Sequence, residues 1–172
     1  MLDAFAQVRA QRRDVHLWIV GEGLHLGDVR RAAERDPAGV FASGAVPHEQ
    51  VAAILAASDI VVCPYPADAP AYFSPLKLVE AMAARRALLA SNVASVRSHV
   101  THGESAWLFE PGSVASWRAG LDALVASRSL RERLAAAAHE RFRRSHTWEA
   151  RARELIAMIA ALRPAAVKEA AS

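Results

Sequence analysis

The segment V-H-L-W-I-V-G-E-G, residues 15–23, decides the fold class. Five of its first six residues are apolar, and Gly21 and Gly23 close the run. A short and almost wholly apolar run that ends in glycines predicts a strand buried on both faces. Such strands are typical of parallel sheets.

The same pattern recurs along the chain. Further strands are expected at 40–43, 59–63, 87–90 and 106–109. Helices are expected at 2–13, 26–34, from Pro47 onward, 75–85, 95–100, 114–127, 130–145 and 148–162. Strands alternating with helices predict an α/β fold, a doubly wound Rossmann-like parallel sheet that binds ligands at the carboxyl ends of its strands. We expect one domain over residues 1–163 and a flexible tail over 164–172, because Pro164 ends the last helix.

Composition excludes several classes of protein. The 172 residues carry a net charge of +3 and are 53% hydrophobic, which is typical of one globular domain. The basic residues form no long run, so we expect no nucleic-acid partner. Cys63 is the single cysteine and lies in an apolar run, which excludes a disulfide framework and fits the cytoplasm. No apolar stretch is long enough for a transmembrane segment.

The stretch Y-F-S-P-L-K-L-V-E-A-M-A, residues 72–83, carries the chemistry. Ser74 is a good N-cap and Pro75 a good first helical residue. The free amides of Leu76 and Lys77 would then point out of the helix start, where partial positive charge favours a phosphate. The Lys77 side chain adds a full positive charge.

Glu80 follows about a turn and a half later on the same helix. A carboxylate there can accept hydrogen bonds from both hydroxyls of a ribose. Together with Lys77 it predicts a site for a nucleoside diphosphate. The alternative, an ordinary capped helix with a solvated lysine and glutamate, stays open on these residues alone.

The segment S-P-L-K-L-V-E-A-M-A, followed by A-L-L-A-S-N-V, resembles the signature of the group 1 glycosyltransferases, which have the GT-B fold. Supporting segments follow the same order over most of the chain. They are V-H-L-W-I-V-G-E-G at 15–23, F-A-S-G-A-V-P at 41–47, A-A-S-D-I-V-V-C-P at 56–64, H-G-E-S-A-W-L-F-E-P-G-S at 102–113 and H-T-W-E-A at 146–150.

The resemblance implies the C-terminal, donor-binding domain of an enzyme that transfers a sugar with retention, needing neither cofactor nor metal. It implies that Glu80 binds the ribose and that Ser74, Leu76 and Lys77 line the diphosphate site. Val46 would lie beside the base. Gly21 and Gly23 would let the backbone turn near the cleft. For Val46 and the two glycines, plain packing and turn geometry stay open as the alternative.

Four residues at three sites depart from the family pattern. Tyr72 stands where many relatives have a glutamate, which leaves the partners of the donor sugar open. Arg85 and the pair Ala94-Ser95 stand where glycines are usual, so local turns are expected to differ.

The resemblance also implies strand order 3-2-1-4-5-6, with a first strand and a whole acceptor-binding domain that lie upstream of Met1 in relatives. The strands at 15–20 and 59–63 would flank that first strand. Without it, their facing edges would have unpaired backbone N–H and C=O groups. We therefore expect this chain to bind a nucleotide sugar without catalysing transfer alone. A separate N-terminal half or a second copy would supply the strand, or the chain is a gene fragment or has a mis-assigned start.

Other functions stay open at this point. The chain could be a non-catalytic nucleotide-binding or subunit-pairing module, or an inactive gene fragment. A receiver-like signalling domain would need an acidic pair after its first strand, which Gly21-Glu22-Gly23 does not supply. We expect a cytoplasmic protein, peripheral at most to the inner face of the membrane. His48 lies at a helix start near Val46. We expect it to be a surface residue rather than part of the cleft.

Overall fold

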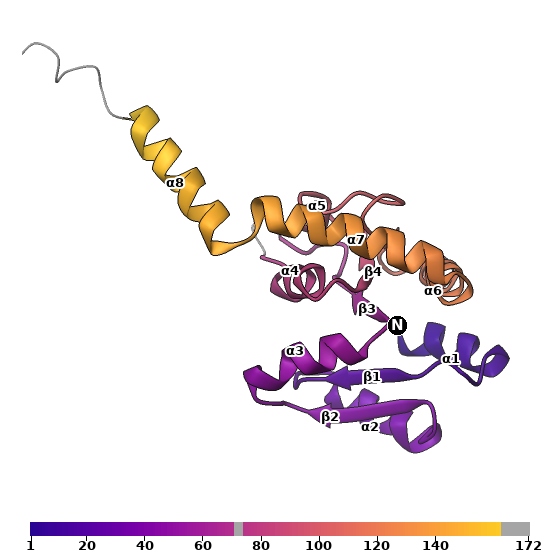
Figure 1. Cartoon of the computed structure of the whole chain (residues 1–172). Coiled ribbons are helices and arrows are strands. Elements are labelled where there is room, and N and C mark those ends of the chain that lie inside the picture. The colour runs from indigo at the N-terminus through magenta and orange to yellow at the C-terminus, as the bar shows by residue number, and fades with distance from the viewer. Residues whose placement is uncertain (71–73, 163–172) are drawn as a thin grey trace, which may run out of the picture.

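The computed structural model describes residues 1–70 and 74–162 (Figure 1). Its strands are β1 (Leu17–Val20), β2 (Val40–Gly44), β3 (Ile60–Cys63), β4 (Ala87–Ser91) and β5 (Trp107–Phe109). Its helices are α1 (Leu2–Gln11), α2 (Leu26–Arg35), α3 (His48–Ala57), α4 (Leu76–Ala83), α5 (Ala94–Arg97), α6 (Val114–Ala126), α7 (Arg128–Ser145) and α8 (Trp148–Leu162). The predicted alternation and the α/β fold class are confirmed. Tyr72 and the predicted tail over 164–172 lie outside the described residues.

The strands form two parallel sheets rather than one. β1 pairs with β2, and β3, β4 and β5 follow one another in a second sheet. Within the described residues β1 and β3 do not pair, and Figure 1 shows the two sheets on opposite sides of the N-terminus. The interruption falls between the two strands that were expected to flank the first strand of relatives.

Strand β4 forms the centre of the larger sheet, and all five of its residues are buried. Successive side chains of a strand point to opposite faces. Leu89 accordingly packs with Phe5 of α1 and Leu124 of α6, whereas Leu88 packs with Leu78 and other residues of a second cluster. Helices on both faces explain why this strand has no polar face.

Helix α1 connects the two sheets. Phe5 and Val8 belong to the same buried cluster as Val40 of β2 and Leu89 of β4. Helix α1 also packs against α6, where Arg118 Nη2 donates to Gln11 Oε1 at 2.7 Å. The hydrophobic contact of α1 therefore stabilises both halves of the molecule at once.

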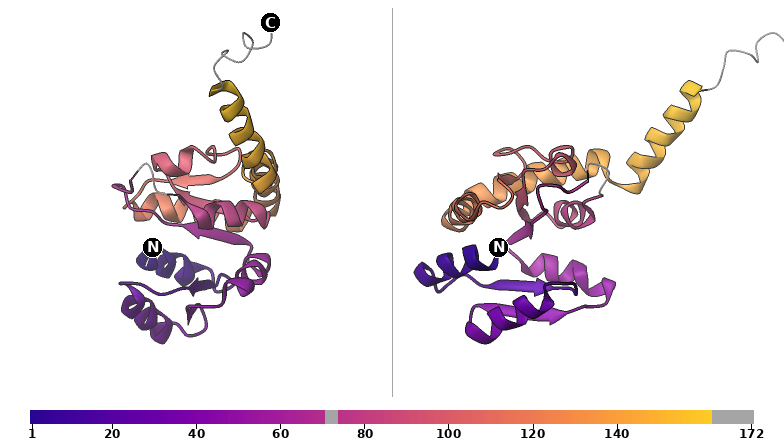
Figure 2. Two further views of the ribbon diagram at one scale, coloured as in Figure 1. Left: turned by 90° about the vertical axis from the view of Figure 1, so that its left-hand side faces the viewer. Right: turned by 180° about the vertical axis from the view of Figure 1, so that it is seen from behind.

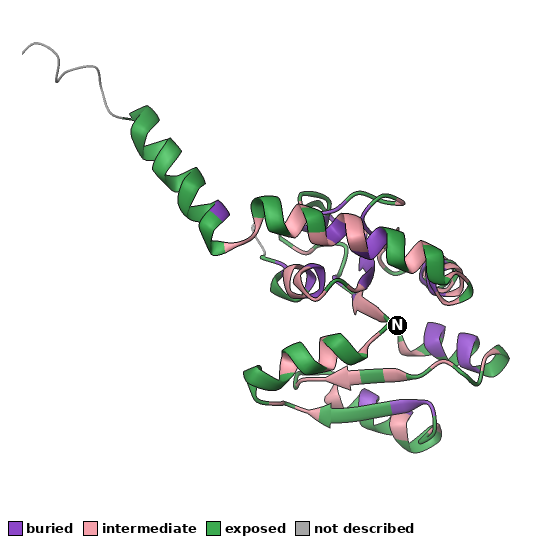
Figure 3. Ribbon diagram, viewed as in Figure 1, coloured by how far each residue is buried: buried purple, intermediate pink, exposed green. Residues whose placement is uncertain are grey.

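Helix α8 projects away from the body of the protein (Figures 1 and 2). Only Ala150 of this helix is buried, and Figure 3 shows the rest of it as exposed. Its large apolar residues are more than half exposed: Trp148, Leu155, Ile156, Met158, Ile159 and Leu162. No helix in the described part of the chain, α8 included, is long and apolar enough to cross a membrane.

Candidate functional site

The loops after β1 and β2 meet through glycine backbone. Gly21 and Gly23 have φ values of +123° and +157°, a region that side chains disfavour. The Gly21 amide donates to the Gly44 carbonyl at 2.7 Å, which fixes the ends of both strands together. Both glycines therefore serve the turn that leaves β1. Their proximity to a nucleotide stays a prediction.

Val46 follows in the loop between β2 and α3, where it is half-buried. It lies two residues before His48, the first residue of α3. This position, after the carboxyl end of a parallel strand, is where ligands bind in folds of this class. Contact with a base stays a prediction for Val46.

The segment that leaves β3 is fixed by a buried hydroxyl. Ser91, the last residue of β4, accepts a hydrogen bond from the Tyr65 amide and donates one to the Tyr65 carbonyl, both at 2.8 Å. Burial raises the pKa of the Tyr65 hydroxyl above its usual range. The Lys77 Nζ lies 5.4 Å from the centre of the Tyr65 ring, which places the cation near the end of β3.

Sequence reasoning missed Tyr65 and Ser91. The one available signal was a serine at the end of the apolar run A-L-L-A-S, residues 87–91. A polar residue there has to find a partner once the strand is buried.

The start of α4 differs from the prediction in one respect. Pro75 is the N-cap, with φ −82° and ψ +64°, and the Leu76 amide donates to the Ser74 carbonyl at 2.9 Å. This is an inverse γ-turn, and it moves Ser74 out of the capping position. The prediction that Ser74 caps the helix and leaves the Leu76 amide free is wrong. The cationic group at this helix start is therefore the Lys77 side chain, and a diphosphate site here stays a prediction.

Glu80 faces a groove between α3 and α4 rather than the protein interior. It is half-buried and lines a space of about 380 Å³ together with His48, Val51 and Leu55 of α3 and Ala83 of α4. The wall of this groove is mostly apolar, so the Glu80 carboxylate is its main acceptor. Such a surface suits a ribose, whose hydroxyls can donate hydrogen bonds to the carboxylate, or the edge of a base.

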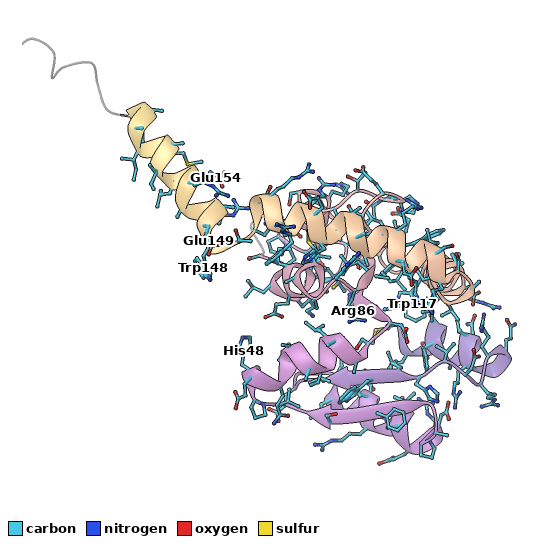
Figure 4. The ribbon with its side chains drawn as sticks, in the orientation of Figure 1. His48, Arg86, Trp117, Trp148, Glu149 and Glu154 are labelled. Carbon is cyan, nitrogen blue, oxygen red and sulfur yellow. The ribbon has the colours of Figure 1, made fainter. Side chains whose placement is uncertain are left out.

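Lys77 and Glu80 lie three residues apart on α4, which places both on one side of the helix. Of the two, only Glu80 lines the groove. His48 is exposed, but it also forms part of the groove wall, so the expected preference for the surface over the cleft holds only for its exposure. Figure 4 shows its side chain at the start of α3, on the side of the molecule where Trp148 lies. Among the described residues, Gly21, Gly23 and Val46 are not part of the groove wall.

Residues 1–70 and 74–162 contain no cluster of three or more histidine, cysteine or carboxylate side chains that could hold a metal ion. The polar groups of α3 and α4 include the Lys77 cation, the Glu80 carboxylate and the His48 imidazole. Their chemistry fits an anionic ligand that also carries hydroxyl groups.

Comparison with solved structures shows the same fold in other proteins. HepE of Anabaena, solved in complex with UDP, superposes with a TM-score of 0.74 at 17% identity, over 93% of this chain and 45% of HepE. Sucrose-phosphate synthase of Thermosynechococcus elongatus gives a TM-score of 0.74 at 21% identity, over 94% of this chain and 42% of the synthase. The chain therefore spans less than half the length of these proteins.

A third structure isolates the matching part. The C-terminal domain of the group 1 family protein LpcC of Francisella tularensis gives a TM-score of 0.69 at 19% identity, over 86% of this chain and 77% of that domain. No curated protein sequence matches the chain. The architecture is thus that of the C-terminal domain of a GT-B glycosyltransferase.

The sequence itself settles the family. The model of the family described as "Glycosyl transferases group 1" matches residues 1–127, which include both sheets, the glycine turns, Lys77 and Glu80. The chain belongs to the group 1 glycosyl transferases.

Proposed function

We propose that residues 1–163 form the nucleotide-sugar-binding domain of a retaining glycosyltransferase. The observation that carries this proposal is Glu80 in a mostly apolar groove, with Lys77 on the same side of α4, in a chain of this family. The UDP complex of HepE supports the choice of ligand class. Other residues proposed to line the site are Ser74, Leu76, Val46, Gly21 and Gly23.

The proposed mechanism assigns electrostatic work to this domain. Lys77 stabilises the negative charge that develops on the leaving diphosphate, and an interaction that strengthens in the transition state accelerates transfer. Glu80 accepts hydrogen bonds from the ribose hydroxyls and so holds the donor in position. The acceptor would be bound by another domain, for which the greater length of the matched structures leaves room. This chain alone would bind the donor without turnover.

Isothermal titration calorimetry with UDP, GDP and their glucose esters tests this site. We expect Glu80→Ala to weaken binding about ten-fold or more, because a hydrogen bond to a charged group contributes about 1.5–3 kcal/mol. Glu34→Ala, which removes an exposed carboxylate from α2, is the matched control and should leave affinity unchanged. Equal binding by the Glu80→Ala variant and the unaltered protein would refute the ribose assignment.

We further propose that a strand from another polypeptide, either a separate N-terminal half or a second copy, inserts between β1 and β3. The amides of Leu17 and Gly21 bond toward β2, so the backbone groups of Trp18 and Val20 face the other way. An added strand would satisfy this edge, as in other cases of strand addition. Hydrogen exchange should be fast at Trp18 and Val20 in the chain alone and slow once the partner binds.

A non-catalytic pairing module or an inactive fragment is the second candidate, favoured by the interrupted sheet. Nucleotide binding that survives without any partner, followed by transfer when an N-terminal half is added, supports the enzyme. Nucleotide binding that never leads to transfer supports the module. No binding in either case supports the inactive fragment.

We propose a cytoplasmic location, with contact at the inner face of the membrane made by the exposed apolar face of α8. An amphipathic helix can lie in the lipid interface without crossing it. Sedimentation with anionic vesicles tests this. Loss of binding in Leu155→Ser/Ile159→Ser supports the proposal, and vesicle binding that does not depend on α8 rejects it.

A further inference from the structure

Four arginines converge on a pocket at the amino ends of β3 and β4. Arg85 and Arg86 come from the turn that enters β4, and Arg128 and Arg131 come from the first turn of α7. The pocket has a volume of about 380 Å³ and also includes the carboxylates of Asp59 and Glu132. Four guanidinium groups against two carboxylates leave two net positive charges in this space.

Two of the guanidinium groups are held in place by main-chain carbonyls. Arg86 Nη1 donates to the Ser58 carbonyl at 3.3 Å. Arg131 Nη1 donates to the carbonyls of Leu124 and Val125, in the last turn of α6, at 2.7 and 3.2 Å. Each arginine keeps further N–H groups, since a guanidinium has five donors. Donors fixed before a ligand arrives lose little entropy on binding it.

Arg128 is oriented by its ion pair with Glu132, in which Nε donates to Oε1 at 2.7 Å. This pair uses the Nε side of the guanidinium and leaves the two Nη groups as donors. Glu132 thus positions Arg128 rather than closing the pocket.

Arg85 has a backbone conformation that arginine rarely adopts. Its φ is +54°, and it is the one non-glycine residue with positive φ in the described parts of the chain. Its side chain is exposed and has no hydrogen bond or ion pair to another described residue. Unfavourable backbone of this kind tends to occur at binding sites. The turn therefore accepts an unfavourable conformation and presents an exposed guanidinium at the pocket.

We propose that this pocket binds a phosphate group, held by Arg86, Arg128 and Arg131 and covered by Arg85. Guanidinium groups match phosphate oxygens because their planar donors bind two oxygens in parallel. The site is separate from the groove at Glu80 and uses different side chains. Its ligand is a small phosphate-bearing anion, either free in solution or as the headgroup of a lipid.

Calorimetric titration of the full chain with inorganic pyrophosphate at low salt tests the site. We expect Arg85→Gly and Arg128→Ala each to weaken pyrophosphate binding about ten-fold. Arg143→Ala removes the same charge from the exposed far end of α7 and should change binding less than about two-fold. UDP affinity should stay unchanged in all three variants, so failure here and failure of the donor site are distinguishable.

Arg85→Gly also separates binding from folding. Glycine tolerates positive φ, so this variant is expected to melt about 2–4 °C higher while it binds pyrophosphate more weakly. Loss of binding in a more stable protein cannot result from unfolding.

Vesicles that contain phosphatidic acid distinguish the two sources of phosphate. The vesicles are tested with the Leu155→Ser/Ile159→Ser variant, which removes the proposed membrane contact of α8. Vesicle binding that Arg85→Gly abolishes in this variant, without any binding of pyrophosphate, supports the site with a lipid ligand. The proposal is overturned if neither probe binds, or if Arg143→Ala weakens binding as much as the pocket variants do.

Discussion

Replacing Ser91 with alanine removes a hydroxyl that makes two buried hydrogen bonds to Tyr65. Ser91 is fully buried, and its partners are the main-chain amide and carbonyl of Tyr65 at 2.8 Å each. A buried polar group that loses its partner costs about 1–3 kcal/mol. Two such groups, one of them a less demanding carbonyl, predict a loss of about 3 kcal/mol in the free energy of unfolding.

Urea denaturation followed by circular dichroism measures this loss directly. The midpoint should fall while its slope stays constant, and the melting temperature should fall by about 6–12 °C for a chain of this size. Affinity for UDP should also fall, because Tyr65 is the ring against which Lys77 lies.

Ser98→Ala provides the control for this experiment. The exposed Ser98 hydroxyl donates only to the Ser95 carbonyl within the same turn, so its loss should cost less than about 0.5 kcal/mol. If Ser91→Ala is as stable as Ser98→Ala, the reasoning that Ser91 fixes the segment after β3 is wrong.

Three further predictions concern packing, pH and reactivity. Gly120→Ala places a Cβ 2.6 Å from the Trp107 ring, and this overpacking should cost about 1–2 kcal/mol in chemical denaturation after the gain in helix propensity. Burial and nearby cationic groups lower the pKa of His99 and His146 below their usual value of 6.5. The unfolded chain therefore binds more protons, so the free energy of unfolding should be highest above pH 6.5 and should fall as the pH decreases. The double variant His99→Gln/His146→Gln should flatten this dependence on pH. Burial raises the pKa of the Cys63 thiol to about 12, so iodoacetamide at pH 8 should modify Cys63 only after unfolding; rapid modification of the native protein would contradict its burial.

The sequence predicted the elements well because local pattern determines them. The run A-L-L-A-S has no polar face, and it forms the fully buried β4. The three-residue spacing of Lys77 and Glu80 was enough to place both on one side of a helix. The glycine turn after β1 followed from residue type alone.

Tertiary contacts account for what the sequence did not predict. The bond between Ser91 and Tyr65 joins residues 26 positions apart, and no periodicity reports it. Ser74 does not cap the helix, because the γ-turn centred on Pro75 uses the Leu76 amide in a hydrogen bond to the Ser74 carbonyl. The exposed apolar face of α8 was not predicted, because what covers such a face depends on surfaces outside the helix.

The contact between α1 and α6 has a consequence for synthesis of the chain. Gln11 and Arg118 are 107 residues apart, so α1 leaves the ribosome long before its packing partner exists. At about 5–20 residues per second, the delay lasts on the order of 5–20 s. During that time Phe5 and Val8 can pack only against earlier residues of their cluster such as Val40, and the surface that α6 later covers stays in water. A nascent chain stalled before α6 should therefore be a species that chaperones capture.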